Sequence, residues 1–250
     1  MESEGRPTIG VRARYAQRVT PADVGERVSV RHRADATAED PRPSDVVGRL
    51  LGHDGEVLLI IDRAERLHVI PAAAVLSSKV VPPHPRLEPE PMVGTPDAPL
   101  VRQAARVLLL DTDDRVLLIA HVPREGERIW TAPGGGLDPG EDHRDAAARE
   151  LSEELGLDVA PGPWVWSRRA TFPFRGVWLD QEERWFLTRT DGAWDPATAP
   201  LDDHGIDEAR WFGLDELRRG EVEVAPQALA DHLEALLRDG PPTTPVDVGR

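Results

Sequence analysis

Three glutamates stand close together in the segment 142–157: Glu150, Glu153 and Glu154. In a helix this spacing places all three carboxylates on one face, opposite a stripe of alanine and leucine side chains. Like charges at about 4 Å repel by roughly 4 kcal/mol at an effective dielectric constant of 20, so such glutamates need a counter-charge. Arg149 supplies one positive charge, and Mg²⁺ or Mn²⁺, which prefer oxygen ligands, would supply the remainder. The pattern therefore indicates metal-assisted chemistry on a phosphate group.

A glycine-rich loop leads directly into this segment. Residues 134–141 read Gly-Gly-Gly-Leu-Asp-Pro-Gly-Glu, and such residues build a tight loop whose backbone can approach a ligand closely. A glutamate-rich helix alone is usually a solvated face, but here the flanking residues follow a longer pattern. Gly-x5-Glu-x7-Arg-Glu-aliphatic-x-Glu-Glu-x-Gly-aliphatic is matched without a gap from Gly135 to Leu157. This pattern resembles the signature of the Nudix hydrolase family.

The resemblance to Nudix hydrolases covers about residues 100–240 in the order of elements, whereas the detailed match is confined to the motif. It implies an α/β/α sandwich that hydrolyses a nucleoside diphosphate linked to another moiety, with water attacking phosphorus. It also implies Mg²⁺ or Mn²⁺ as the cofactor and a nucleotide-derived small molecule as the substrate. Bound cations neutralise phosphates and glutamates together, which reconciles an acidic domain with an anionic substrate.

The resemblance assigns roles to the matching positions of the motif. Glu150 and Glu154 are the principal metal ligands, and Glu153 is a third ligand or the proton acceptor. The carbonyl of Gly135 is a candidate for a further ligand. Arg149 orients the carboxylates around the metal.

Other acidic residues have supporting roles under the same resemblance. Glu141 braces the loop and the metal shell. Nudix enzymes often recruit one more acidic residue from outside the motif as base or ligand, and the candidates are Asp180, Glu182 and Glu183, with Glu182 preferred. A solvated edge strand or turn is the alternative for all three, and Glu208 is assigned a structural role in a late strand.

The substrate contacts are predicted less sharply. Trp130 is a candidate for stacking on a base, and Arg124 or Arg128 for holding a distal phosphate. The alternative is a buried tryptophan and solvent-facing arginines, because aromatic side chains mostly pack in cores. The motif leaves open whether the substrate is a nucleoside triphosphate, a nucleotide sugar, ADP-ribose, a dinucleoside polyphosphate or capped RNA.

Composition excludes several other kinds of chemistry. The chain has no cysteine, so it has no disulfide framework, thiolate zinc site or cysteine nucleophile. Its only lysine, Lys79, lies far from the glycine loop, so no lysine completes a phosphate loop there. The net charge of −15 opposes non-specific binding to nucleic acid or anionic membranes. With no membrane-length apolar run and an acidic, polar start, we expect a cytoplasmic protein.

A proline-rich stretch divides the chain. Seven prolines fall between Pro82 and Pro99, and all seven tryptophans follow them. Residues 18–82 resemble the SH3-like module that precedes some bacterial acetyltransferase domains. The expected domains are an SH3-like β-barrel over 1–82 with a disordered start at 1–10, a linker over 83–99, a Nudix hydrolase domain over 100–240 and a disordered tail over 241–250.

Hydrophobic patterns place the elements that position the motif. Five strands are expected before the linker, at residues 27–33, 45–52, 56–62, 66–70 and 79–81, with a helical turn at 71–76. After it, strands are expected at 101–110, 115–121, 129–132, 164–172, 176–188 and 208–212. Helices are expected at 142–155, 214–219 and 226–238. The expected fold class is α/β, a Nudix sandwich with a small N-terminal barrel.

A second function remains open beside hydrolysis. A catalytically weak Nudix module that senses nucleotides or binds a protein would keep the fold without useful turnover. Every charged motif position is present here, which favours the enzyme. A homodimer is compatible with the family, and the N-terminal domain is open as a lid, a dimerisation surface, a peptide-binding module or a stabilising accessory.

Overall fold

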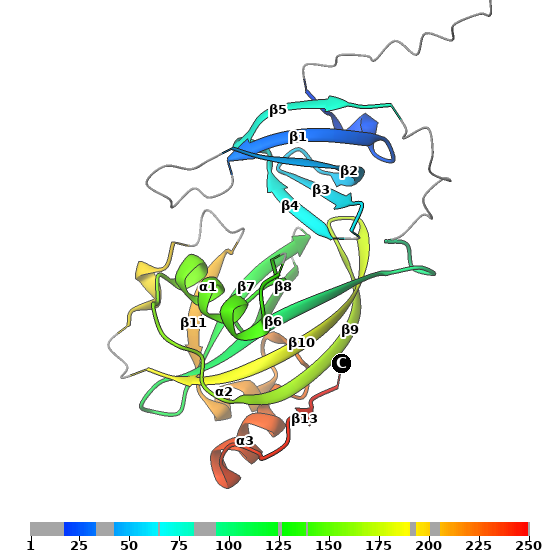
Figure 1. Ribbon diagram of the computed structural model, residues 1–250. Helices are drawn as coiled ribbons and strands as arrows, with labels where there is room; N and C mark the ends of the chain where they lie inside the picture. Colours follow the sequence, from blue (N-terminus) through cyan, green and yellow to red (C-terminus); the bar gives the residue numbers. More distant parts are fainter. Residues whose placement is uncertain are drawn as a thin grey trace, which may run out of the picture. The chain divides into compact units, whose positions relative to one another are not determined.

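We describe the protein from a computed structural model of its 250 residues (Figure 1). The structure describes residues 18–33, 43–64, 66–82, 94–124, 127–138, 140–190, 194–200 and 206–249. The expected disordered start and most of the expected linker lie outside these residues. The chain divides into two compact units, one within residues 1–94 with residues 175–177, the other within residues 95–174 and 178–250. We describe each unit by itself.

The first unit is a five-stranded antiparallel sheet. Its strands are β1 (Arg27–Arg33), β2 (Pro43–His53), β3 (Val57–Asp62), β4 (Leu67–Pro71) and β5 (Val75–Val80). They pair in the order β4-β3-β2-β1-β5, so the first and last strands in sequence are neighbours in the sheet. Alternating valine, leucine and isoleucine side chains of these strands form its core.

Turn chemistry sets the ends of these strands. The hairpin between β2 and β3 turns at Asp54-Gly55, between the two strands predicted over 45–52 and 56–62, with a positive φ of 98° at the glycine. The carboxylate of Asp54 accepts hydrogen bonds from the backbone N–H groups of Glu56 and Val57, at 2.9 and 2.8 Å. The helical turn predicted over 71–76 is shorter, because the 3-10 turn Ala72–Ala74 is followed at once by β5.

The second unit is built on an eight-stranded mixed sheet. The pairing order is β12-β8-β7-β6-β10-β9-β13, with β11 also paired to β7. At its centre β6 and β10 run parallel in continuous register. The strands are β6 (Leu100–Leu110), β7 (Val116–Arg124), β8 (Glu127–Thr131), β9 (Trp164–Phe174), β10 (Val177–Arg189), β11 (Glu208–Phe212), β12 (Glu223–Ala225) and β13 (Val246–Asp247).

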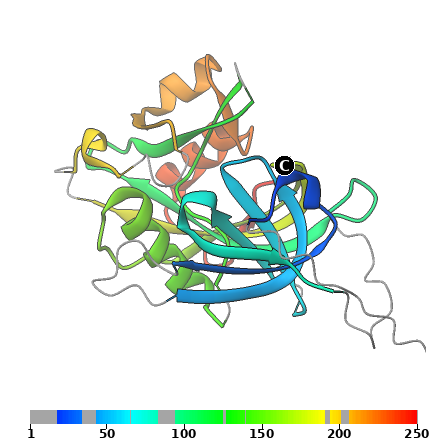
Figure 2. The same cartoon turned by 90° about the horizontal axis from the view of Figure 1, so that it is seen from above.

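Helices cover both faces of this sheet. They are α1 (His143–Leu155), α2 (Leu214–Arg219) and α3 (Leu229–Asp239). Leu108 of β6 packs in the core cluster that contains α2 and α3 residues, whereas its neighbour Leu109 packs in the cluster that contains α1 residues. Figure 2 shows α1 on one side of the sheet and α2 and α3 on the other.

Capping fixes the ends of α1, and these ends lie close to those of the helix predicted over 142–155. The side chain of Asp142 accepts hydrogen bonds from the backbone N–H groups of Arg144 and Asp145 at the start. The helix ends at Gly156, whose φ of 64° suits a residue without a side chain. Its buried apolar stripe consists of Ala146, Ala147, Leu151 and Leu155.

The C-terminal tail corrects one expectation. A disordered tail was expected over 241–250, but Val246 and Asp247 form β13 and pair in parallel with β9. Val248 is buried and belongs to the core cluster of α2 and α3. Burial of this valine and the added strand bonds explain why a polar, proline-rich segment is ordered here.

Candidate active site

Arg149 gathers the acidic side chains of the motif. Its Nε donates to Glu141 at 2.9 Å, and its Nη1 donates to Glu150 at 3.0 Å and to Glu153 at 2.9 Å. Its Nη2 also donates to the carbonyl of Gly136, at 3.0 Å. One guanidinium therefore contacts three carboxylates and the glycine loop, and the role predicted for Arg149, to orient these carboxylates around a metal, stays a prediction.

The loop itself is braced by Glu141. Besides its bonds to Arg149, its Oε2 accepts a hydrogen bond from the backbone N–H of Asp138 at 2.8 Å. Although burial opposes it, the bonds from Arg149 and from that backbone N–H hold the pKa of Glu141 below its ordinary value. This carboxylate is therefore charged near neutral pH and ties the loop to the helix.

Glu150 and Glu154 lie against the glycine loop, Glu154 buried and Glu150 with 13% of its side chain exposed. Glu154 is only 6% exposed, and its Oε2 accepts a hydrogen bond from the N–H of Gly134 at 2.8 Å. A side chain at Gly135 would place its Cβ 2.3 Å from Oε1 of Glu150, so the glycine makes room for that carboxylate. Burial raises the pKa of both acids, that of Glu154 to about 8 with the neighbouring Glu150 as the next cause.

These residues fit a bound divalent cation. Among the described residues, no three His, Asp or Glu side chains are already arranged as a metal site. Two adjacent buried carboxylates with raised pKa values nevertheless need positive charge before both can ionise, and one arginine cannot supply it for the whole cluster. The Gly135 carbonyl accepts a hydrogen bond from Ala105, and a carbonyl oxygen retains a second lone pair.

A buried polar cluster on β6, β9 and β10 was not predicted from the sequence. Glu183 is 3% exposed and accepts hydrogen bonds from Gln181 and Trp185, both at 2.8 Å. Arg168 reaches the same carboxylate at 3.3 Å, and the Nε of Arg106 lies 3.6 Å from it. The polar residues of this cluster on β10 lie at the inward positions of the strand, where side chains alternate between buried and less buried. This alternation is the sequence signal from which the cluster could have been predicted.

Arg106 connects this cluster to the glycine loop. Its Nη1 donates to the carbonyls of Gly134 at 2.5 Å and Ala132 at 3.1 Å. Gly134 in turn donates to Glu154, so the loop joins the two polar groups. The buried Nε atoms of Arg106 and Arg168 have no hydrogen-bond partner among the described residues.

Glu182, the preferred acid from outside the motif, lies on the opposite face of β10 from Glu183. Its side chain is 43% exposed, accepts a hydrogen bond from Gln103 at 2.7 Å and pairs with Arg169 at 3.3 Å. Gln103 also contacts His143, at the start of α1. The structure thus places Glu182 near the start of α1, where Gln103 lies between it and His143.

Two of the predicted substrate contacts, Trp130 and Arg128, contact residues outside the motif. Trp130 is 3% exposed and packs edge-on against Phe212, with 4.8 Å between ring centroids. Arg128 forms ion pairs with Asp207 and Glu208. The side chain of Arg124 lies outside the described residues. Substrate binding by these three residues stays a prediction, and the burial of Trp130 favours its packing role.

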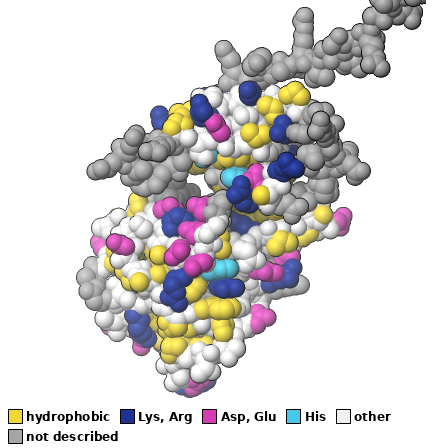
Figure 3. Space-filling view, viewed as in Figure 1, with side chains coloured by type: hydrophobic (Ala, Val, Ile, Leu, Met, Phe, Trp, Pro, Cys, Tyr) yellow, Lys and Arg dark blue, Asp and Glu magenta, His cyan; other side chains and the backbone are white. Residues whose placement is uncertain are grey.

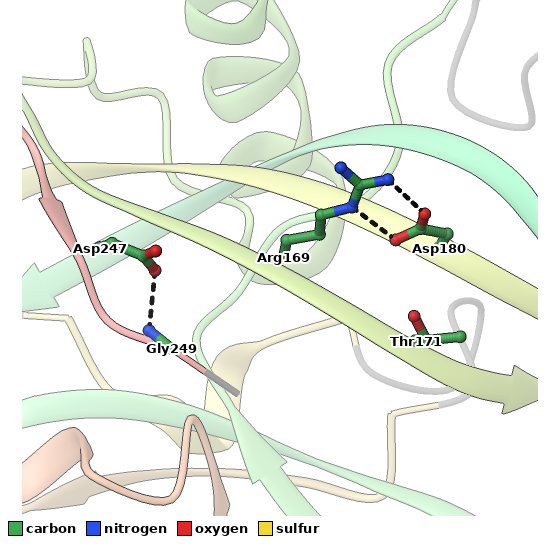
Figure 4. Close-up of a pocket in the computed structure, with 5 residues that line it drawn as sticks. All are labelled: Arg169, Thr171, Asp180, Asp247 and Gly249. Carbon is green, nitrogen blue, oxygen red and sulfur yellow. Dashed lines mark hydrogen bonds and ion pairs between the residues drawn. The ribbon is translucent and has the colours of Figure 1, made fainter.

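A separate pocket of about 340 Å³ opens beside β13 (Figure 4). Its lining residues are Arg169, Thr171, Asp180, Asp247 and Gly249. Figure 4 shows Arg169 bonded to Asp180 across two strands, at 2.9 and 2.6 Å. None of the lining residues belongs to the motif, and Asp180, one of the two acids in the pocket, is already paired with Arg169.

Comparison with known proteins decides the family. The NUDIX domain pattern matches residues 100–233, more than half of the chain. The chain belongs to the Nudix family. This Nudix protein is 31% identical over 134 residues to an RNA pyrophosphohydrolase of Erythrobacter litoralis, covering 47% of the chain and 79% of that protein. An RNA pyrophosphohydrolase of Rickettsia africae is 30% identical over 131 residues, covering 46% and 77%.

Solved structures include similar Nudix proteins. A NUDIX hydrolase from Nitrosomonas europaea matches with a TM-score of 0.43 and 26% identity, covering 56% of this chain and 90% of that one. The family match and the relatives establish the activity at the level of class: the protein is a Nudix hydrolase acting on phosphoanhydride bonds of nucleotide-derived substrates. Divalent metal dependence is typical of the family. None of the described helices is long and apolar enough to cross a membrane.

Proposed function

We propose that Glu150 and Glu154 bind Mg²⁺ or Mn²⁺, and that the protein hydrolyses a nucleoside diphosphate linked to another moiety. The observation that carries this proposal is the pair of buried carboxylates with raised pKa values against a glycine loop. A site that must ionise two adjacent buried acids is built for a cation rather than for stability.

The residues of the chain prepare this site before any ligand arrives. When bound, the divalent cation offsets the charge of the phosphates and lowers the pKa of the attacking water. Gly134 fixes one oxygen of Glu154, and Arg149 fixes Glu150 and Glu153. Glu153 is only partly buried, so it is our candidate for a third ligand or for the group that accepts the proton of the water.

Glu182 remains our proposed acid from outside the motif. It is solvent-accessible, and Gln103 contacts both Glu182 and His143 at the start of α1. A substrate bound beside α1 therefore has access to this carboxylate. Glu183 is a poorer candidate because its oxygens are occupied by four side chains. Glu183 serves instead as the counter-charge of Arg106 and Arg168.

The substrate class is tested with a panel. The named relatives are RNA pyrophosphohydrolases, so the panel includes 5′-triphosphorylated RNA beside nucleoside triphosphates, nucleotide sugars, ADP-ribose and dinucleoside polyphosphates. Figure 3 shows acidic and basic side chains interspersed on one face, without a continuous basic surface among the residues it colours. With a net charge of −15, we expect recognition of a phosphorylated end rather than of an RNA body.

The deciding experiment reads products by chromatography with Mg²⁺ and with Mn²⁺. We expect cleavage of one phosphoanhydride bond in at least one substrate, and its loss in Glu154→Gln. Ligand-induced thermal stabilisation without any product would instead favour the nucleotide-sensing alternative.

We further propose that the first unit is an SH3-like barrel that acts as an accessory domain. Its support is the five-stranded order in which β1 pairs with β5, and its core of small aliphatic residues. The family match begins at residue 100, after this unit. A homodimer is also proposed, and light scattering of the full chain tests it: a mass near 27.5 kDa would contradict it.

A further inference from the structure

Arg102 is a partly buried cation without an ion pair among the described residues, although the charges of Glu150 and Glu183 act on it from farther away. It lies on β6, and its one hydrogen bond among the described residues runs from Nη1 to Oε1 of Gln181, at 3.3 Å. No carboxylate of the described residues lies within ion-pair distance of it. On the same sheet face Arg106 and Arg168 both have Glu183 within 4 Å, so Arg102 is the exception. Burial and the neighbouring Arg106 lower its pKa to about 10, which leaves it charged at neutral pH.

The glycine loop brings this cation next to the proposed metal site. A Cβ at Gly136 would lie 2.4 Å from Nε and 2.5 Å from Nη2 of Arg102. A Cβ at Gly135 would lie 2.3 Å from the carboxylate of Glu150. Consecutive Cα atoms are about 3.8 Å apart. Two neighbouring glycines therefore make room for a guanidinium and for a metal-binding carboxylate.

Arg102 is also held in a fixed orientation. Gln181 is buried, and its Nε2 donates to Glu183 at 2.8 Å while its Oε1 accepts from Arg102. A guanidinium has five N–H donors in a planar fork, and only one of them is used here. The remaining donors match the paired oxygens of a phosphate group.

We propose that Arg102 binds a phosphate group of the substrate beside the metal held by Glu150 and Glu154. The identity of the ligand rests on the proposed function, whereas the missing anion is a property of the site itself. The arginine supplies the positive charge that the carboxylates of the motif do not. It is a substrate-binding residue that the family motif does not contain.

Inorganic pyrophosphate is the probe, and calorimetry of the full chain with and without Mg²⁺ measures its binding. Because hydrogen bonds to charged groups are strong, Arg102→Met should weaken pyrophosphate binding roughly 10- to 100-fold. Arg102→Lys should retain part of it, since the charge stays and the fork is lost. Arg189→Ala removes an exposed arginine that pairs with Asp114 and should bind like the wild type.

Two further readings separate binding from folding. Without ligand, Arg102→Met should melt no lower than the wild type, because it removes an unpaired, partly buried charge. With the substrate found in the panel, it should raise KM about tenfold or more and change kcat less. A lower melting temperature with unchanged pyrophosphate affinity per folded molecule would show a structural role and overturn the proposal.

The outcomes also distinguish this inference from the proposed function. If Arg102→Met and the wild type bind pyrophosphate equally, or if the wild type does not bind it at millimolar concentration, the role of Arg102 is wrong even when Glu154→Gln abolishes hydrolysis. If Glu154→Gln retains full hydrolysis, the proposed metal site is wrong, and Arg102 is still judged by pyrophosphate binding.

Discussion

The first unit keeps its described charged side chains out of its core cluster, whereas several charged side chains of the second unit are buried. In the first unit Arg31 and Asp45 pair across two strands with about half of each side chain exposed, and the core cluster contains only aliphatic residues. In the second, Glu154 and Glu183 are buried, and Arg102 has no carboxylate partner among the described residues. The first arrangement is what folding alone favours, and departures from it mark the region organised for a ligand.

The largest expected effect concerns Glu154. Glu154→Gln keeps the size of the side chain and removes its charge, so we expect turnover to fall by roughly a thousandfold or more. Steady-state hydrolysis of the substrate from the panel measures this. Asp45→Asn, a matched charge loss in the first unit, should leave turnover unchanged. Equal losses in both variants would remove the difference between the two regions.

Arg149 should have the next largest effect, on stability. Arg149→Met leaves Glu141, Glu150 and Glu153 without their shared counter-charge. We therefore expect the free energy of unfolding of the second unit to fall by about 2–3 kcal/mol. Urea titration followed by tryptophan fluorescence reports this unit alone, because all seven tryptophans lie between residues 130 and 211. A midpoint equal to that of the wild type would contradict the role of Arg149.

The metal-free second unit should lose stability as the pH rises. The pKa of Glu154 is raised to about 8 in the folded chain and is about 4.3 in the unfolded chain, so folding favours the protonated acid. Its contribution is therefore most favourable below about pH 4.3 and declines up to about pH 8, by on the order of 5 kcal/mol. Fluorescence-detected urea unfolding at several pH values in EDTA measures it.

Glu154→Gln is the control for that pH dependence. The variant has no titrating group at this position, so its unfolding free energy should change less between pH 5 and pH 8 and exceed that of the wild type at pH 8. If the wild type and the variant show the same pH profile, Glu154 is not the buried acid that we describe.

The first unit should respond to pH with the opposite sign. Although burial opposes it, bonds from Arg66, His68 and backbone N–H groups hold the pKa of Asp62 well below its ordinary value. Its stabilisation is thus complete above about pH 3.9 and is lost as the pH falls through the folded pKa. Asp62→Asn should lower the free energy of unfolding of the first unit by roughly 1–2 kcal/mol at pH 7, which hydrogen exchange of β3 and β4 measures. Unchanged exchange in those strands would contradict this account.

Helix α1 was predictable because the residues that determine it are close together in the sequence. The cap at Asp142, the apolar stripe and the terminal Gly156 lie within one short segment, and the motif lies in the same segment. The hairpin turn at Asp54-Gly55 was predictable for the same reason.

The polar cluster was not predictable, because it depends on strand pairing over long distances. Arg102 and Gln181 are neighbours in parallel strands although 79 residues separate them. The sequence placed Glu182 and Glu183 together as candidate acids, but the register of β10 sends one to each face of the sheet. The tail strand was missed because two residues carry no periodic pattern, and a single buried valine anchors it.

Titration with Mn²⁺, followed by electron paramagnetic resonance of the free ion, tests the central claim most directly. The full-length wild type should bind Mn²⁺, and the double variant Glu150→Gln, Glu154→Gln should lose that binding while a folded chain is retained. The Asp45→Asn variant should bind as the wild type does. Unchanged Mn²⁺ binding in the double variant would contradict the claim that these buried carboxylates hold the metal.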